Sequence, residues 1–176
     1  MITKQATKQE FEQAFYFIER LWDYNVYDKE AVRNVYKEIL ADENSFAFFL
    51  CDENGEYCGF CHGSFFLTFW MSGMTCYLAS IITDEKYRGK GYGRLMVDHV
   101  KKLAKARGCK AIILDSGMPR KAAHAFYERY GFEKSCYGFE LFLKYWISIY
   151  TDKKEAGTAL VEMCKEIKSV NAPAMM

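Results

Sequence analysis

The spacing of apolar positions in the first half of the chain predicts a short strand, two helices and then three more strands. Phe11, Phe15 and Leu21 recur at helical period, and Thr7 with Glu10 three residues later has the spacing of a capping box. Later apolar runs are separated by turn signals, which is typical of hairpin strands. The expected elements are a strand at 2–6, a helix after Thr7, a helix at about 29–40, and strands at 46–51, 56–68 and 74–83, with an Asn54-Gly55 turn.

The second half of the chain predicts a long helix, a buried strand and a closing set of elements. Met96, Val100 and Leu103 lie on one face of a helix that Gly108 ends. The run at 110–115 is almost wholly apolar, the pattern of a buried parallel strand. The remaining expected elements are a helix from near Pro119 to Gly131, strands at 132–133 and 137–145, and an amphipathic helix at about 152–170. This order predicts an α+β or mixed α/β domain around one sheet.

Three alternating glycines join the end of a strand to the start of the long helix. Gly89, Gly91 and Gly93 leave backbone N–H groups uncovered where the first donors of the helix lack partners. Such helix N-termini bind anions, because the free donors and the helix dipole both favour negative charge. The spacing matches neither the dinucleotide fingerprint nor the P-loop. The loop therefore predicts a phosphate site or, as the plainer alternative, a structural turn.

The composition of the chain indicates which kinds of binding partner are not expected. Apolar residues make up 51% of the 176 positions, charged residues make up 27%, and the net charge is +1, so neither a nucleic-acid nor a membrane partner is indicated. There is no apolar run of about 18 residues and no signal-like N-terminus. Seven scattered cysteines suit reduced thiols, and the expected location is cytoplasmic. The string from Cys58 to His62 has the form of a haem attachment site but lies inside a predicted strand, so no haem or metal is expected.

A second motif follows the next predicted strand, and together the two motifs resemble a known family. The first runs from Arg88 to Gly93, and the second is Phe126-Tyr127 followed by Gly131-Phe132. They are similar to the two hallmarks of the GCN5-related N-acetyltransferases (GNAT). The resemblance implies an α+β fold with one mostly antiparallel mixed sheet flanked by helices, as a domain at 1–145. The extension at 146–176 would pack its amphipathic helix on the same domain or on a second subunit of a homodimer.

The resemblance also implies which residues bind acetyl-CoA. In the family two neighbouring strands separate beside the first motif, and backbone groups there pair with the pantetheine arm near the thioester carbonyl. The glycine loop would hold the pyrophosphate, and Tyr127 matches the tyrosine that protonates the departing thiolate. Arg120 stands where many relatives carry a cofactor-contacting asparagine. The implied cofactor-binding residues are Ile81, Ile82, Thr83, Arg88, Gly89, Lys90, Gly91, Tyr92, Gly93, Arg94 and Arg120.

The sequence offers more than one candidate for the general base. Acetyl transfer needs a neutral amine, and an alkyl ammonium with a pKa near 10.4 leaves about one molecule in 10³ uncharged at pH 7, which adds about 4 kcal/mol to the barrier. Some relatives place a catalytic carboxylate where this chain has Asp115, which could equally cap the next helix or its preceding turn. His124 is a second candidate. Ala79 and Ser80 stand where relatives often carry an acid.

The sequence therefore predicts an acyltransferase that moves the acetyl group of acetyl-CoA directly to a primary amine of a small molecule. A covalent relay is not expected, because neither motif contains a cysteine. Two alternatives stay open. One is a peptide or protein N-acetyltransferase, and the other is an acyl-CoA-binding module without catalysis.

Overall fold

The computed structural model describes residues 1–141. The chain divides into two compact units, of which the larger comprises Met1–Leu21 and Tyr27–Phe139 and contains every described helix and strand. The smaller unit is described only at Trp22–Val26 and at residues 140–141, and there the N–H of Asn25 donates to the C=O of Trp22 at 3.0 Å and closes a turn.

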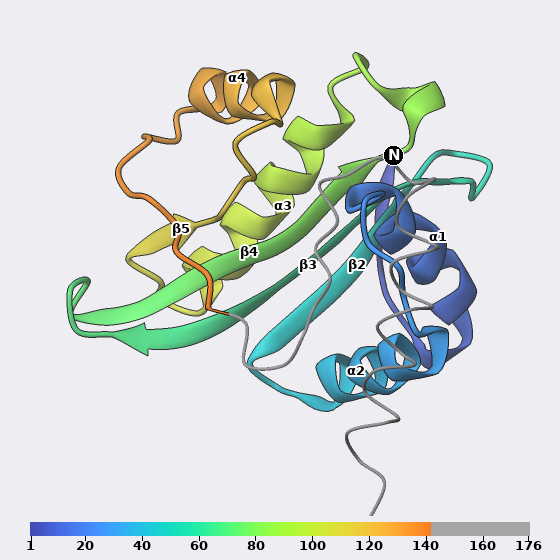
Figure 1. The fold of residues 1–176 in the computed structure, drawn as a ribbon, viewed down its shortest axis with the longest axis horizontal. Coiled ribbons are helices and arrows are strands. Elements are labelled where there is room, and N and C mark those ends of the chain that lie inside the picture. The colour runs from blue at the N-terminus through green and yellow to red at the C-terminus, as the bar shows by residue number, and fades with distance from the viewer. Residues whose placement is uncertain (142–176) are drawn as a thin grey trace, which may run out of the picture. The chain divides into compact units, whose positions relative to one another are not determined.

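A five-stranded sheet in the order β1-β2-β3-β4-β5 forms the centre of the larger unit (Figure 1). The first four strands are antiparallel to their neighbours, whereas β5 joins β4 in parallel. The sheet is thus mixed and mostly antiparallel, as predicted. The strands are β1 Ile2–Gln5, β2 Ser45–Cys51, β3 Tyr57–Thr68, β4 Gly73–Thr83 and β5 Ala111–Ile113.

Two of the helical segments in the first half of the chain begin where local capping chemistry favours them. The Thr7–Glu10 capping box is present, and the Asp28 carboxylate accepts hydrogen bonds from the N–H groups of Glu30 and Ala31. The helical elements are η1 Lys8–Glu10, α1 Phe11–Leu21, α2 Lys29–Ala41, η2 Glu85–Tyr87, α3 Tyr92–Ala106 and α4 Lys121–Tyr130.

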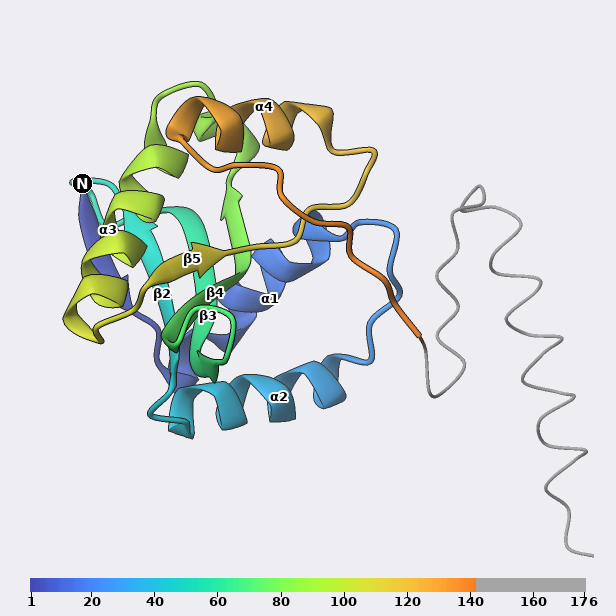
Figure 2. The same cartoon turned by 90° about the vertical axis from the view of Figure 1, so that its left-hand side faces the viewer.

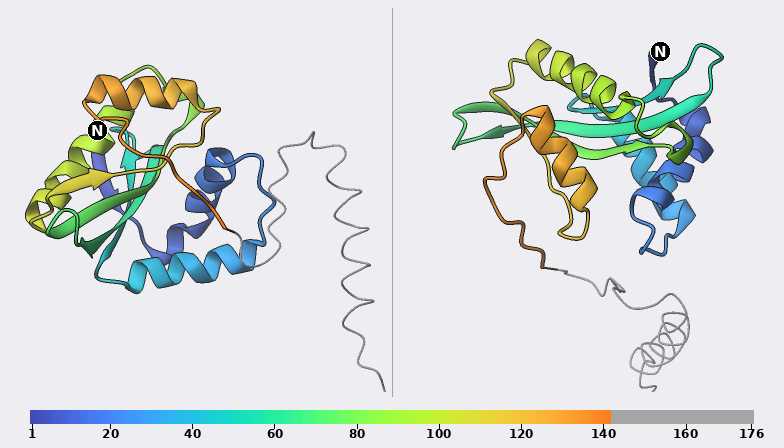
Figure 3. Two further views of the ribbon diagram at one scale, coloured as in Figure 1. Left: turned by 60° about the vertical axis from the view of Figure 1, so that its left-hand side comes forward. Right: turned by 90° about the horizontal axis from the view of Figure 1, so that it is seen from above.

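Alternating side chains along β3 show which helices lie on which face of the sheet. Phe17 of α1 stacks on Phe60 with ring centroids 6.5 Å apart. The next residue, Cys61, points to the opposite face and packs in one cluster with Met96 of α3. The helices α1 and α3 therefore cover opposite faces, as Figures 2 and 3 show. We name these the α1 face and the α3 face.

The α3 face carries the main apolar core, and its inner stripe is the one that the spacing predicted. Met96 and Val100 are fully buried against the sheet. Phe126 of α4 packs against the same cluster, which places α4 on this face too. Much of the aromatic stretch between Phe46 and Tyr77 is core, whereas Phe69 at the tip of the β3–β4 hairpin is fully exposed.

The strands β4 and β5 pair over a short distance and then part. Their register runs from Thr75 opposite Ala111 to Tyr77 opposite Ile113, where β5 ends. β4 continues to Thr83, so within the described residues its edge beyond Tyr77 lacks a strand partner on the β5 side. This separation positions the functional site.

The predicted strands at 132–133 and 137–145 are wrong over the part of the chain that the structure describes, since residues 132–141 form no strand. Phe132 belongs instead to the C-terminal cap of α4, because its N–H donates to the C=O of Tyr127 and its ring packs on Tyr127 and Tyr130. Tyr137 and Phe139 alternate as in a strand but are 81% and 93% exposed. The rest of the second strand, the boundary near 145 and the helix at 152–170 lie outside the described residues.

Candidate active site

The predicted glycine loop forms an open backbone cradle at the start of α3. Gly89 and Gly91 have φ of 75° and 82°, a left-handed conformation that favours glycine, and neither has a neighbouring atom within 4 Å of an added Cβ. Gly91 is the N-cap of α3 and offers no side chain to the first-turn N–H groups. These donors therefore face open space, as an anion site requires.

Three exposed cations surround the cradle. The Arg88 guanidinium lies 3.4 Å from the Glu85 carboxylate and donates from Nε to the C=O of Thr83 at 3.4 Å. Lys90 lies 5.3 Å from the centroid of the Tyr87 ring. Arg94, in the first turn of α3, stands over the ring of Tyr130. The positive charge and the free donors thus converge on one loop.

The strand end, the helix start and the second motif meet at Gly93. A Cβ at Gly93 would lie 3.3 Å from the Phe126 ring and 3.8 Å from Oγ1 of Thr83. A side chain at Gly93 would displace the Phe126 ring by a few tenths of an ångström, so glycine suits this close approach of α3, α4 and β4. The structure therefore brings the cradle, the free edge at 81–83 and the helix that carries Tyr127 into one site.

Tyr127 lies in the wall of this site on the α3 face. Its side chain is 7% exposed and packs edge-on against the Phe126 and Phe132 rings. Burial raises the pKa of its hydroxyl, and the charge of Arg120 opposes that rise. The phenol therefore keeps its proton at neutral pH. Within the described residues this hydroxyl makes no hydrogen bond, which leaves it available to a ligand.

Asp115 contacts Tyr77 and does not cap the next helix. The N-cap of α4 is Arg120, with no side-chain capping hydrogen bond, so the alternative in which Asp115 caps that helix is not realised. Asp115 is exposed and its Oδ2 accepts a hydrogen bond from the Tyr77 hydroxyl at 3.0 Å. His124 lies within hydrogen-bond distance of the C=O of Gly117, at 3.1 Å, and so fastens α4 to the loop before it.

One contact at the site had no signal in the local sequence. The Tyr16 hydroxyl of α1 donates to the buried carboxylate of Asp84 at 2.8 Å, and that carboxylate also accepts from the N–H of Lys86. The Arg20 guanidinium stacks over the Tyr16 ring. This contact fixes α1 to the segment that leads into the cradle. Only a sheet topology that brings α1 beside the end of β4 could have predicted it.

The haem-like string does not form a site. Cys58 and Cys61 are fully buried, and consecutive strand residues Cys61 and His62 point to opposite faces. Among the described residues no group of His, Cys, Asp or Glu side chains has a metal-binding arrangement. No helix in the described part of the chain is long and apolar enough to cross a bilayer.

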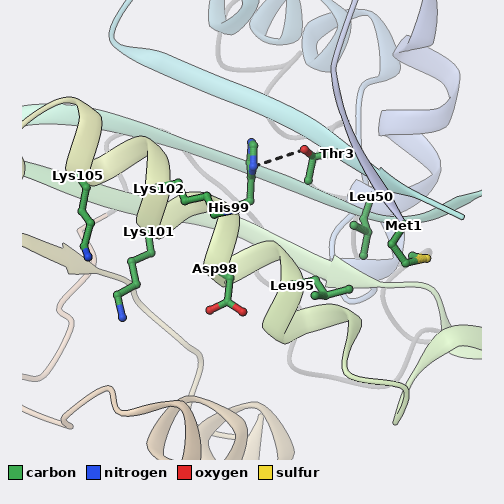
Figure 4. A pocket seen from close by; sticks show the side chains of 9 residues that line it. All are labelled: Met1, Thr3, Leu50, Leu95, Asp98, His99, Lys101, Lys102 and Lys105. Atoms are coloured by element: carbon green, nitrogen blue, oxygen red, sulfur yellow. Dashed lines mark hydrogen bonds between the residues drawn. The ribbon is translucent and has the colours of Figure 1, made fainter.

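A separate hollow lies between β1 and α3 (Figure 4). Its volume is about 520 Å³ and its lining includes His99, Lys101, Lys102 and Lys105. None of the predicted site residues lines it, so it is distinct from the cradle.

Comparisons with known proteins show which proteins the chain is similar to. The family model "Acetyltransferase (GNAT) family" matches residues 7–132. An uncharacterized N-acetyltransferase of Methanocaldococcus jannaschii, MJ1207, is 28% identical over 71% of this chain and 56% of its own length. The uncharacterized N-acetyltransferase YhdJ of Bacillus subtilis is 30% identical over 58% of this chain and 72% of its own. The chain thus spans little more than half of MJ1207.

A solved structure shares the fold at low sequence identity. The aminoglycoside N-acetyltransferase AAC(6')-Iy in complex with CoA superposes with a TM-score of 0.70 at 18% identity, covering 80% of this chain and 93% of that one. At this identity the likeness concerns the fold alone.

Proposed function

The chain belongs to the acetyltransferase (GNAT) family, and from that premise we propose that it moves the acetyl group of acetyl-CoA directly to a primary amine of a small molecule. The observation that carries the proposal is the junction at Gly93, where the anion cradle, the free edge of β4 and the helix of Tyr127 meet. One end of this arrangement suits a pyrophosphate, and the other suits a reacting thioester.

The residues present fit the donor. The open backbone at Gly89 and Gly91 would receive the pyrophosphate, with Arg88, Lys90 and Arg94 offsetting its charge. The unpaired β4 edge at 81–83 would pair with the amide groups of the pantetheine arm, as an added strand would. When bound, acetyl-CoA supplies the activated acyl group. The CoA complex of the similarly folded aminoglycoside enzyme supports this assignment.

The two sides of the sheet would then do different parts of the chemistry. Backbone N–H groups near Ile81 would stabilise the oxyanion, a contribution typically worth about 10²–10³ in rate per donor. From the α3 face, the buried Tyr127 hydroxyl would protonate the departing thiolate. The exposed carboxylate of Asp115 would attract the ammonium form of the acceptor and pass its first proton to water.

A screen for CoA release tests the proposal. Purified protein and acetyl-CoA would be incubated with polyamines, amino acids, aminoglycosides and short peptides, and free thiol would be followed with time. We expect release that depends on a small amine. Release only with peptides would favour a peptide N-acetyltransferase. Tight donor binding without release for any amine would contradict catalysis and favour an acyl-CoA-binding module.

A further inference from the structure

Two polar side chains on neighbouring strands face the same side of the sheet next to the reacting end of the site. His62 of β3 and Ser80 of β4 are register partners across an antiparallel pair, so their side chains share a face. That face also carries Phe60, two residues before His62, which stacks on Phe17 of α1. His62 and Ser80 therefore lie on the α1 face, opposite the core that holds Tyr127.

Neither side chain has a hydrogen-bonding partner among residues 1–141. Ser80 is 6% exposed and His62 is largely buried. Neither side chain makes a hydrogen bond anywhere in the described part of the chain. Among the described residues, Ser116 Oγ is the only completely buried polar side-chain atom that lacks a hydrogen-bond partner. The polar atoms of His62 and Ser80 also lack partners, so they are not completely buried and still border open space. Because these atoms border open space and lack a partner among the described residues, water or a ligand would complete their hydrogen bonds.

The pair lies beside the slot where acetyl-CoA would bind, by which we mean the gap between β4 and β5 beyond Tyr77 and Ile113. Ser80 directly precedes Ile81 and belongs to the stretch of β4 that has parted from β5. Neighbouring strands lie about 4.8 Å apart, so His62 on β3 is one strand away from the open edge of β4 at Ile81, a separation that a bridging water would span. A thioester carbonyl bound there would be open to the α1 face on one side and to Tyr127 on the other.

Building on the proposed function, we propose that His62 is the catalytic base that removes the second proton of the acceptor amine, through a water molecule that Ser80 also holds. The imidazole is neutral at pH 7, because burial alone lowers its pKa to about 4. Nearby hydroxyls on the α1 face do not compete for it, since Tyr16 donates to Asp84 and Tyr77 donates to Asp115.

The step balances with these residues alone. The amine nitrogen adds to the thioester carbon, forming a C–N bond and an adduct with a positive nitrogen and a negative oxygen. The bridging water takes a proton from that nitrogen and gives one of its own to His62. The C–S bond then breaks, the carbonyl re-forms, and the thiolate takes the Tyr127 proton. Transfer of the imidazolium proton to water and back to the tyrosinate restores both side chains.

Variants of His62 test the assignment, with His99 as a matched control. His99 is also a partly buried histidine with a pKa lowered by burial, but it lies on α3 and lines the separate hollow. We expect His62→Gln to lower kcat about 100-fold, in the range of a lost general base, and to leave the acetyl-CoA dissociation constant within twofold. His99→Gln should change neither value by more than twofold.

A rescue experiment separates catalysis from structure. In His62→Ala, added imidazole should raise kcat at least tenfold in proportion to its concentration, which a purely structural defect would not show. Wild-type kcat in His62→Gln, or no rescue of a His62→Ala protein that still binds acetyl-CoA, would overturn the inference while the proposed function stands. A wild-type protein that acetylates no amine would overturn both.

Discussion

The Tyr77 hydroxyl donates a hydrogen bond to Oδ2 of Asp115 at 3.0 Å, directly where β4 and β5 part. Tyr77 is in the last paired rung of the two strands, opposite Ile113, and Asp115 follows two residues after β5 ends. One carboxylate oxygen is thus held by the tyrosine, and the other makes no hydrogen bond within the described residues, so under the proposed function it would attract the ammonium group of the acceptor.

This contact predicts different effects for its two partners. Asp115→Asn should lower kcat/KM for the amine at least tenfold, because the free charge is lost, and should leave KM for acetyl-CoA unchanged. Tyr77→Phe keeps the charge and should cost less than threefold. Steady-state kinetics of both variants provide the measurement. Equal small losses would show that the pair serves only the structure.

Replacing Tyr127 with Phe should slow turnover and spare donor binding. The variant keeps the ring that packs on Phe126 and Phe132 but lacks the acidic hydroxyl. We expect kcat to fall about 100-fold, as for loss of a general acid, with an unchanged dissociation constant for acetyl-CoA by calorimetry. Equal turnover in the two proteins would rule out the acid role.

The glycine cradle can be tested against a second glycine with the same backbone strain. Gly91 and Gly108 both have positive φ, 82° and 69°, and both have open space around an added Cβ. Changing either to Ala should cost about 1–2 kcal/mol of unfolding free energy. Only Gly91→Ala should also weaken acetyl-CoA binding, by about tenfold, because Gly108 is at the far end of α3. Denaturant unfolding and calorimetry measure the two effects, and equal affinity losses would contradict a cradle.

His62 should make stability depend on pH. Burial lowers its pKa from 6.5 to about 4, so the unfolded chain binds more protons than the folded protein between these values. The contribution is complete above pH 6.5 and is lost as the pH falls toward 4. From pH 7 to pH 5 this loss is about 2 kcal/mol. The free energy of unfolding in urea should therefore fall by about 2 kcal/mol more for the wild type than for His62→Gln between pH 7 and pH 5. An equal fall in the two proteins would argue against a buried neutral imidazole.

The sequence predicted well those features that depend on neighbours in the chain. The stripe of Met96 and Val100, the Thr7–Glu10 capping box and the order of helices and strands along the chain up to Tyr130 follow from local spacing, and the structure confirms them. The family motifs identified the loop and the aromatic helix because both are short continuous strings.

Features that depend on tertiary contacts could not be predicted from the local spacing of residues. Phe132 resembles the start of a strand in the sequence, but its N–H closes the cap of α4 and its ring packs on that helix. The hydrogen bond from Tyr16 to Asp84 and the facing pair His62 and Ser80 join segments that only the sheet register brings together. The register of β3 and β4 is what places His62 and Ser80 on one face of the sheet.

The central claim is direct acetyl transfer to an amine, and the most direct test follows the acetyl carbon. Acetyl-CoA labelled with carbon-13 in the acetyl group would be supplied with the best amine of the screen, and the products would be analysed by mass spectrometry. The account predicts labelled N-acetyl amine in a one-to-one ratio with released CoA. Labelled acetate in its place, or unconsumed acetyl-CoA with every amine, would contradict it.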